Sequence, residues 1–250
     1  MDKDNAYPEV AGLKSQVTVV IPCFNAGHRL KATLDRVCPL VDRVVLVDDG
    51  STDGCTDGLE GYPVIKSVLP ANRGKGYALI EGIHRALALP DTGAIALMDA
   101  DGQHDPGDLP ALFAVYRRHD ADLVIGTRQL DRARTPWRSW FGNQVTAWVA
   151  RKLLRCPLSD TQCGYRILSP RFAGAFVTTV SGGRYETEME MILLAVNGGY
   201  TLLSAPVTTI YEAGNRSSHF RKVRDSLRIY TTLWRGLRNR NTAPRSRRRV

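Results

Sequence analysis

The chain has 250 residues, of which 43% are hydrophobic, and its formal net charge is +9. This length suits one sizeable α/β domain, or one domain with an appendage. No apolar run reaches the roughly 18 residues of a membrane span, and the polar segment 1–14 gives no secretory signal pattern. The five cysteines lack Cys-X-X-Cys spacing, so we expect reduced thiols in a cytoplasmic protein, without a zinc site or disulfide framework.

Short β-branched or apolar runs alternate with segments of helical periodicity along the first half of the chain. We predict strands at 17–21, 44–47, 64–68, 94–98 and 123–125. Between them, apolar residues recur at helical spacing in 30–37, 76–89 and 109–116. This alternation predicts an α/β fold, in which helices cover a mostly parallel, Rossmann-like sheet.

The alternation of strands and helices ends after residue 126. We predict an amphipathic helix over 137–154, a loop over 158–165, and helices over 170–177 and 186–196. The segment 200–211 is predicted to be a strand pair or a long edge strand, with Pro206 marking a bend or an edge.

Polar residues follow four of the predicted strands, at the point where each strand ends. They are Asn25 after the first strand, Asp48 and Asp49 after the second, Asp99 and Asp101 after the fourth, and Arg128 after the fifth. Each group alone is also an ordinary turn sequence. Because ligands of open α/β sheets bind at the carboxyl ends of the strands, we expect these side chains to form one site.

Asp99 and Asp101 lie two positions apart, so they project to one side if the strand geometry continues. Two such carboxylates repel each other unless a cation lies nearby, and hard oxygen ligands suit Mg²⁺ or Mn²⁺. The segment 72–76 precedes a helix, so its backbone amides and Lys75 could meet phosphate. It lacks Walker spacing, and no Gly-X-Gly-X-X-Gly follows the first strand, which argues against a P-loop NTPase and a dinucleotide enzyme.

These motifs together resemble the family 2 glycosyltransferases, which have the nucleotide-sugar-binding A-type fold. The motifs are Val20-Ile-Pro-Cys-Phe-Asn25, Val47-Asp-Asp-Gly-Ser-Thr-Asp53, Asn72-Arg-Gly-Lys-Gly76, Met98-Asp-Ala-Asp-Gly-Gln-His104 and Gly126-Thr-Arg128. The later stretch Asp160-Thr-Gln-Cys-Gly-Tyr-Arg166 is similar to the loop of the polyprenyl-phosphate branch, the dolichyl-phosphate mannosyl- and glucosyltransferases. The resemblance runs in consistent order over residues 17–233.

The resemblance implies roles for individual residues. Nucleotide-sugar binding is implied for Pro22, Phe24, Asn25, Asp48, Asp49, Lys75, Asp99 and Ala100. Asp101 and Gln103 would coordinate the divalent ion, Mg²⁺ or Mn²⁺. Arg128 would meet the sugar or the acceptor phosphate, and Arg166 would bind the acceptor phosphate. The branch usually has Glu after Pro-X-Tyr-Asn; here Ala26 takes that place and Phe24 replaces Tyr, so one donor contact is missing or supplied elsewhere.

The resemblance also implies an inverting displacement, in which the metal stabilises charge on the departing nucleoside diphosphate. A phosphate acceptor is already ionised and needs no general base, whereas a hydroxyl acceptor requires a carboxylate to take its proton. Glu186, Glu188 and Glu190 are candidates at the start of a predicted helix, with Glu186 and Glu190 on one face. We expect Glu188 to join Asp99, Asp101, Arg128 and Arg166 in catalysis. The alternative is a solvated face favoured by the helix dipole.

The positive charge is concentrated at the end of the chain. Residues 216–250 carry 12 Lys or Arg and one acidic residue, whereas the first 215 residues carry 22 basic and 24 acidic residues. We therefore divide the chain into an extension (1–15), a catalytic domain (16–215), a basic amphipathic helix (216–240) and a disordered basic tail (241–250). The helix either packs on the core or lies on an anionic membrane surface, which we favour. Nucleic acid is a less favoured partner, because no reading module accompanies the tail.

The expected function is a cytoplasmic, metal-dependent, inverting transfer of a hexose from a GDP- or UDP-linked sugar to a membrane-associated acceptor. The favoured acceptor is a polyprenyl phosphate, which would bring the enzyme to the inner face of the membrane as a peripheral protein. One alternative is the same fold acting on a hydroxyl of another lipid or glycan. A second alternative is a non-catalytic basic protein that binds membrane or nucleic acid.

Overall fold

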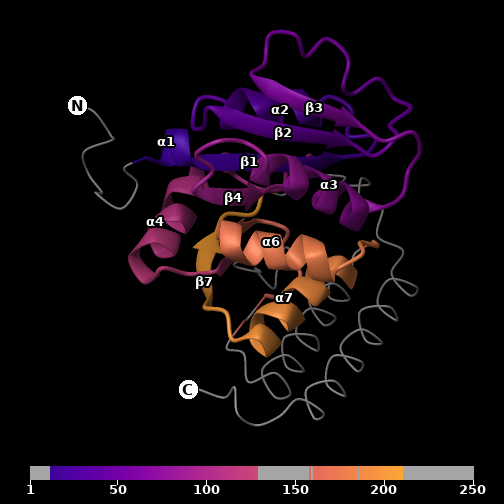
Figure 1. The fold of residues 1–250 in the computed structure, drawn as a ribbon. Helices are drawn as coiled ribbons and strands as arrows, with labels where there is room; N and C mark the ends of the chain where they lie inside the picture. The colour runs from indigo at the N-terminus through magenta and orange to yellow at the C-terminus, as the bar shows by residue number, and fades with distance from the viewer. Residues whose placement is uncertain (1–11, 129–157, 159, 185, 211–250) are drawn as a thin grey trace, which may run out of the picture.

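The computed structural model describes residues 12–128, 158, 160–184 and 186–210. The strands in these residues are β1 (Val17–Cys23), β2 (Arg43–Asp48), β3 (Val64–Val68), β4 (Ala94–Leu97), β5 (Leu123–Arg128), β6 (Arg166–Leu168) and β7 (Leu202–Val207). They form one sheet in the order β3-β2-β1-β4-β6-β5-β7 (Figure 1). The strands β1 to β4 pair in parallel, β6 lies antiparallel between β4 and β5, and β7 is parallel to β5. The predicted mostly parallel sheet is confirmed.

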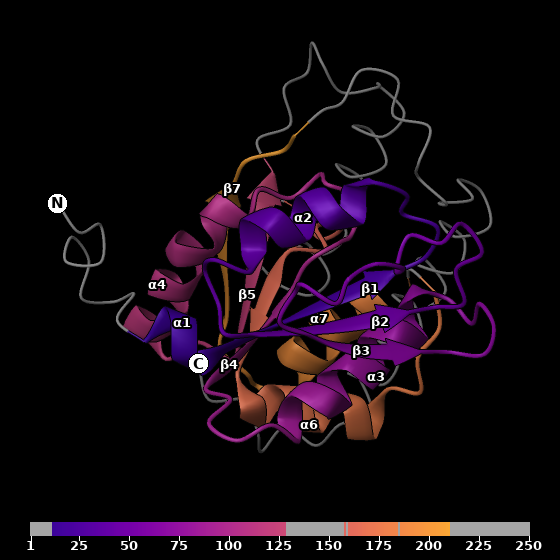
Figure 2. The ribbon, with the colours of Figure 1, turned by 90° about the horizontal axis from the view of Figure 1, so that it is seen from above.

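Helices cover both faces of this sheet. They are α1 (Leu13–Gln16), α2 (Arg29–Val37), α3 (Lys75–Leu87), α4 (Leu109–His119), α6 (Pro170–Thr179) and α7 (Glu186–Gly198), with a 3-10 turn at Pro106–Asp108 before α4. Seen from above, α2 and α4 lie on one face, and α3 and α6 on the other (Figure 2). Among these helices, none combines the length and the apolar composition that crossing a bilayer requires.

Strands β1 and β4 are apolar except for Thr18, because both faces of the sheet are covered here. Every residue of β1 and β4 is buried, as expected for strands in a helix-covered parallel sheet. Helix α3 packs closely on β1: a Cβ added to Gly82 would lie 2.3 Å from Val20 Cγ1. A side chain at this position would push the helix off the sheet, so glycine sets the helix–sheet distance here.

Two predictions for the second half of the chain are settled by the sheet. The predicted loop 158–165 runs directly into β6, so the expectation that Arg166 lies in a loop is wrong. A strand of three residues is too short to show periodicity in sequence. The segment 200–211 contains a single strand, β7, at the edge of the sheet, where Pro206 is tolerated. The predicted helix 137–154, most of the extension 1–15, and the segments 216–240 and 241–250 lie outside the described residues.

The topology brings distant segments to one edge of the sheet. Parallel strands β1, β2, β4 and β5 all end there, and antiparallel β6 begins there. After β7 the chain reaches the same edge: Thr209 forms an antiparallel bridge with His104, and the Ile210 N–H donates to Gln103 O at 3.0 Å. The segments that follow β1, β2, β4, β5 and β7, and the one that precedes β6, therefore meet at this edge of the sheet.

Candidate active site

Asp48 and Asn25 shape the loop that follows β2. The Ser51 N–H donates to Asp48 Oδ1 and the Thr56 hydroxyl donates to Asp48 Oδ2, both at 2.8 Å. Asn25 has a positive φ of 50° and accepts the Thr52 N–H at Oδ1, at 2.8 Å. Both side chains thus accept hydrogen bonds from the loop after β2. The nucleoside contacts expected of them stay predictions.

Three apolar residues expected at the nucleotide lie at the same edge of the sheet. Pro22 is buried in β1 opposite Val47, and Phe24 is half-buried directly after β1. Ala100 is 6% exposed in the turn after β4. Pro22 and Phe24 flank Cys23, which pairs with Asp48 across the sheet, and the nucleoside site expected here stays a prediction.

Asp49 fixes the glycine-rich loop that precedes α3. Its Oδ1 and Oδ2 accept the backbone N–H groups of Arg73 and Gly74, each at 2.8 Å. Burial raises the pKa of Asp49, and these two hydrogen bonds partly offset the rise. The two-point attachment sets where Lys75, the first residue of α3, enters the site.

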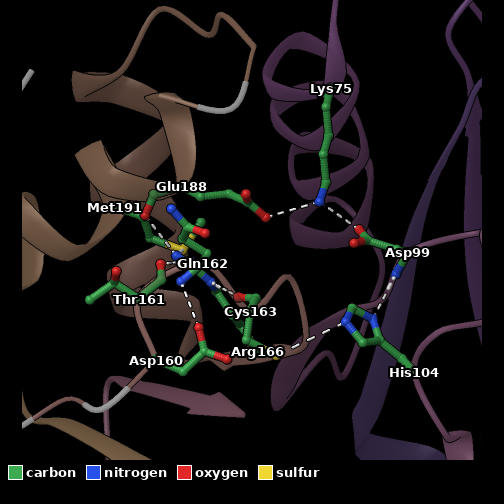
Figure 3. A network of polar contacts seen from close by, with 10 residues as sticks. All are labelled: Lys75, Asp99, His104, Asp160, Thr161, Gln162, Cys163, Arg166, Glu188 and Met191. Carbon is green, nitrogen blue, oxygen red and sulfur yellow. Dashed lines mark hydrogen bonds and ion pairs between the residues drawn. The ribbon is translucent and has the colours of Figure 1, made fainter. Parts of the chain in front are cut away.

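Lys75 joins two carboxylates that are far apart in the sequence. Its Nζ lies 2.7 Å from Asp99 Oδ1 and 2.9 Å from Glu188 Oε1 (Figure 3). Burial alone lowers the pKa of Lys75, but the charges of Asp99 and Glu188 outweigh it and hold that pKa above its usual value. For Asp99, burial raises the pKa, but the charge of Lys75 and its hydrogen bond outweigh the effect of burial, so the pKa lies below its usual value. A charged bridge therefore links α3, the loop after β4, and α7.

Glycines let α3 and α7 approach closely enough for this bridge. The Gly76 N–H donates to Gly183 O at 3.0 Å. A Cβ added to Gly76 would lie only 2.1 Å from Thr187 Oγ1 and 2.7 Å from Gly183 N. Any side chain at position 76 would separate the two helices.

Asp99 and Asp101 lie in a turn rather than along a strand. β4 ends at Leu97, so the strand geometry assumed for the pair does not continue. Asp101 Oδ1 accepts the Gln103 N–H at 3.0 Å. Burial raises the pKa of Asp101, and the negative charge of Asp99 raises it further. The turn, not the strand, brings the two like charges together.

The donor chemistry at this turn fits a hard divalent cation. Two neighbouring carboxylates offer the oxygen ligands that Mg²⁺ and Mn²⁺ prefer. Within the described residues, no group of three or more His, Cys, Asp or Glu side chains gathers to enclose a metal ion. Such a site is complete only with other oxygens, as in proteins where Mg²⁺ is held by one or two carboxylates and substrate phosphates.

His104 is a part of the site that the sequence analysis gave no role. The Asp99 N–H donates to His104 Nδ1 at 3.2 Å, and the ring stacks on Tyr165 with centroids 5.2 Å apart. Burial lowers the pKa of His104, against the opposing charges of Asp99 and Asp101. Because its Nδ1 accepts the Asp99 N–H, the ring supports the main chain of the turn. Its place at the end of the Met98–His104 motif was the available signal.

Arg128 ends β5 and is held by Asp160, a second residue without an assigned role. Arg128 Nε lies 2.6 Å from Asp160 Oδ2, and Nη2 lies 3.1 Å from Oδ1. Asp160 is 1% exposed, and the Gln162 N–H donates to its Oδ1 at 3.0 Å. This bidentate pair fixes the guanidinium plane of Arg128 at the edge of the sheet.

Arg166 does not face the site as expected. It is 0% exposed, and its guanidinium donates to the main-chain oxygens of Thr161, Cys163 and Glu188. The structure therefore corrects the prediction of an acceptor-phosphate contact: the side chain is directed into the protein, where main-chain carbonyls satisfy it.

The three glutamates at the start of α7 separate as predicted. Glu188 is 7% exposed and contacts Lys75. The pKa of Glu190 is raised by burial and by the charge of Glu186, which places those two near each other. Only Glu188 of the three forms an ion pair with Lys75 in the described structure.

The comparisons with known proteins agree with this fold. The family model described as glycosyl transferase family 2 matches residues 18–170. An uncharacterized protein of Methanocaldococcus jannaschii is 34% identical over 209 residues, covering 79% of this chain and 83% of that protein. The polyprenol monophosphomannose synthase of Mycolicibacterium smegmatis is 28% identical, covering 76% of each chain.

A solved structure shares the architecture at low sequence identity. It is the glucosyl-3-phosphoglycerate synthase of Mycobacterium tuberculosis, crystallised with Mn²⁺, UDP-glucose and phosphoglyceric acid. The TM-score is 0.68 at 19% identity, over 95% of this chain and 83% of that one. The predicted A-type fold and family are confirmed. The chain is a glycosyltransferase and belongs to glycosyl transferase family 2.

Proposed function

We propose that this glycosyltransferase transfers a hexose from a nucleotide sugar to a membrane-associated polyprenyl phosphate. The observation that carries the acceptor class is the ion pair between Lys75 and Glu188, at 2.9 Å. Glu188 is the carboxylate that could act as a general base, but its negative charge is already paired with Lys75. A phosphate acceptor attacks through an oxygen that is ionised at neutral pH, so it needs no such base.

Similar proteins support the same acceptor class. The undecaprenyl-phosphate mannosyltransferase of Micrococcus luteus is 28% identical over 208 residues, covering 78% of this chain and 84% of that protein. Its name and that of the mycobacterial synthase specify polyprenyl phosphates as acceptors.

Asp101 and Gln103 would hold the divalent ion, Mg²⁺ or Mn²⁺, with Asp99 beside them at the nucleotide sugar. When bound, the ion would stabilise the negative charge that develops on the departing nucleoside diphosphate. Lys75 adds a positive charge beside Asp99, 2.7 Å away. Arg128 would meet the sugar or the acceptor phosphate, with Asp160 fixing the orientation of its guanidinium.

The nucleoside would lie against Phe24 and Pro22, with Asp48 and Asp49 nearby. Because Asp48 and Asp49 bind the loops around them, their role in base recognition would be to set loop shape as well as to accept hydrogen bonds. Both UDP- and GDP-linked hexoses fit this proposal.

A hydroxyl acceptor is the second candidate, since Glu188 reaches the site. In that case Glu188 would have to leave Lys75 and take the proton. Removing a general base typically costs about 10²- to 10⁴-fold in rate. Glu188→Gln should therefore abolish transfer to a hydroxyl, but with a phosphate acceptor the loss should stay below about tenfold, because no proton is removed.

The test is a matched pair of acceptors given to the full-length protein. Short-chain polyprenyl phosphate and the corresponding polyprenol are incubated with UDP- and GDP-hexoses and Mg²⁺ or Mn²⁺, and nucleotide release is measured. We expect release only with the phosphate, and none with EDTA. Transfer to the polyprenol that requires Glu188 would replace the proposal with the second candidate.

A further inference from the structure

Arg166 is the largest fully buried side chain in the described part of the chain. Its Nε donates to Cys163 O at 2.9 Å, Nη2 to Thr161 O at 3.1 Å, and Nη1 to Glu188 O at 2.8 Å. Burying a charged group is costly unless hydrogen bonds satisfy it. The guanidinium meets that requirement because its five N–H groups form a planar fork that reaches several acceptors at once.

These acceptors belong to two segments that each carry a polar side chain of the site. Thr161 adjoins Asp160, which binds Arg128. Glu188 accepts Arg166 with its main chain and Lys75 with its side chain. Figure 3 shows Arg166 between these two segments.

We infer that Arg166 is a positioning residue that acts through Asp160 and Glu188. It sets the spacing between Arg128 on one side of the site and the Lys75–Asp99 pair on the other. The expected effect on kcat/KM for the acceptor rests on the proposed function. The role of Arg166 in holding the two segments together does not.

A lysine cannot replace this arginine, although it keeps the charge. Its single nitrogen cannot reach three carbonyls that diverge from a planar group. Methionine has a comparable apolar stem and no donor, so it leaves the three carbonyls without this partner. In either variant the loop and the first turn of α7 lose their common attachment, whereas the loops after β1 and β2 keep theirs.

The kinetic experiment compares Arg166→Met and Arg166→Lys in the full chain. A small misplacement of groups in a site can cost about 100-fold in rate, so we expect a loss of this order in kcat/KM for the acceptor. The KM for the nucleotide sugar should rise much less, since Lys75 keeps Asp99 as a partner and the loops after β1 and β2 are unchanged. Equal loss on donor and acceptor constants, or full activity of Arg166→Lys, would overturn the inference.

Asp122→Asn is the matched control for lost stability. Asp122 is 3% exposed at the start of β5, away from the site, and accepts from Ser169 Oγ at 3.0 Å and from Thr201 N at 2.9 Å. This variant should lower Tm while leaving both KM values unchanged. If it reproduced the acceptor defect, the effect of Arg166 would be one of stability alone.

A double-mutant cycle with Arg128→Met tests the route of the effect. If Arg166 acts partly through Asp160 and Arg128, the acceptor defect of Arg166→Met should be smaller in the Arg128→Met background. Fully additive losses would count against that route.

Hydrogen exchange decides the inference without any transfer assay. In Arg166→Met, the amides of Gln162 and of residues 187–190 should exchange faster, while the amides of β1 and β2 keep their rates. If Arg166→Met folds poorly, the same measurement is made on Arg166→Lys. Unchanged exchange at both segments would overturn the inference whatever the enzyme does. Absence of transfer by the wild type would instead count against the proposed function.

Discussion

The ionised form of Asp101 destabilises the folded protein when no metal is bound, because burial and the charge of Asp99 disfavour that form. Asp101→Asn removes that repulsion, so it should leave Tm unchanged or slightly higher, while abolishing transfer and Mn²⁺-dependent binding of UDP or GDP. Thermal unfolding and nucleotide titration, each with and without Mn²⁺, measure the two effects. A variant that retains Mn²⁺-dependent nucleotide binding contradicts the assignment of Asp101 as a metal ligand.

Asp122 makes stability depend on acidic pH. Burial raises the pKa of Asp122, but hydrogen bonds from Arg171, Thr201 and Ser169 outweigh it and hold the pKa below the usual 3.8. Its contribution is therefore complete above pH 3.8 and is lost as the pH falls through the lower, folded-state pKa. Asp122→Asn should cost about 1–3 kcal/mol at pH 7.

Urea unfolding of the wild type and of Asp122→Asn, at pH 7 and at successively lower pH, measures this dependence. The difference in unfolding free energy between the two proteins should shrink on the acidic side of pH 3.8. A difference that stays constant with pH would show that the carboxylate charge is not responsible.

At the level of elements, the contact between α3 and α7 depends on a missing side chain. Gly76→Ala places a Cβ 2.1 Å from Thr187 Oγ1, and overpacking of this kind typically costs about 1–3 kcal/mol. Because the helices must separate, the Lys75–Glu188 ion pair should lengthen as well. We therefore expect a lower unfolding free energy and a lower kcat.

The control substitution is Gly174→Ala in α6, where a Cβ would meet nothing within 4 Å. Alanine in a helix interior is favoured over glycine by roughly 0.5–1 kcal/mol, so this variant should gain stability. Denaturant unfolding and kcat are measured for both. Equal effects of the two substitutions would show that the α3–α7 contact is not specific.

Local patterns predicted the elements well, but not the pairing between them. The strand predicted at 64–68 coincides with β3, and the helix predicted at 186–196 lies within α7. β6 was missed, because its three residues begin with a buried arginine, a residue type that seldom marks a strand in sequence. The charged bridge from Lys75 to Glu188 spans 113 positions, and no local pattern encodes it.

The site residues divide in the same way. Asp99, Asp101 and Arg128 were predicted because each lies within three residues of the end of a predicted strand. Asp160 and His104 act on groups that only the folded chain brings near, so sequence spacing gave them no role. Arg166 was identified as important but for the wrong contact, since sequence cannot show which way a side chain points.

For the whole molecule, the separation of charge supports a proposed attachment to anionic membranes. The 12 basic residues beyond residue 215 should bind acidic lipids, with each contributing about 1 kcal/mol near the surface. Screening acts over about 8 Å at physiological salt, so binding should weaken with added salt. Sedimentation with anionic and with neutral liposomes, over a range of salt, measures this attraction.

Charge reversal of the arginines in 245–249 is the matched change, because it leaves the described domain intact. It should reduce binding to anionic liposomes and leave nucleotide binding unchanged. Equal binding of the native protein to neutral and anionic liposomes would refute an electrostatic attachment.

The proposed membrane attachment lies close to the site along the chain. Thr209 and Ile210 make main-chain contacts with His104 and Gln103, so the basic segment begins only a few residues beyond the site. Only five residues separate Ile210 from Arg216, the first of the basic group, so the two lie within about 20 Å in any conformation. This is less than the thickness of a bilayer's hydrocarbon core, about 30 Å. Once the basic residues rest on a membrane, lipid phosphates would be presented to the turn proposed to bind the metal, at an effective concentration in roughly the millimolar range. The enzyme would then search for its acceptor along the membrane surface. An acceptor dissolved in bulk water would compete with the lipid acceptor only at a similarly high concentration.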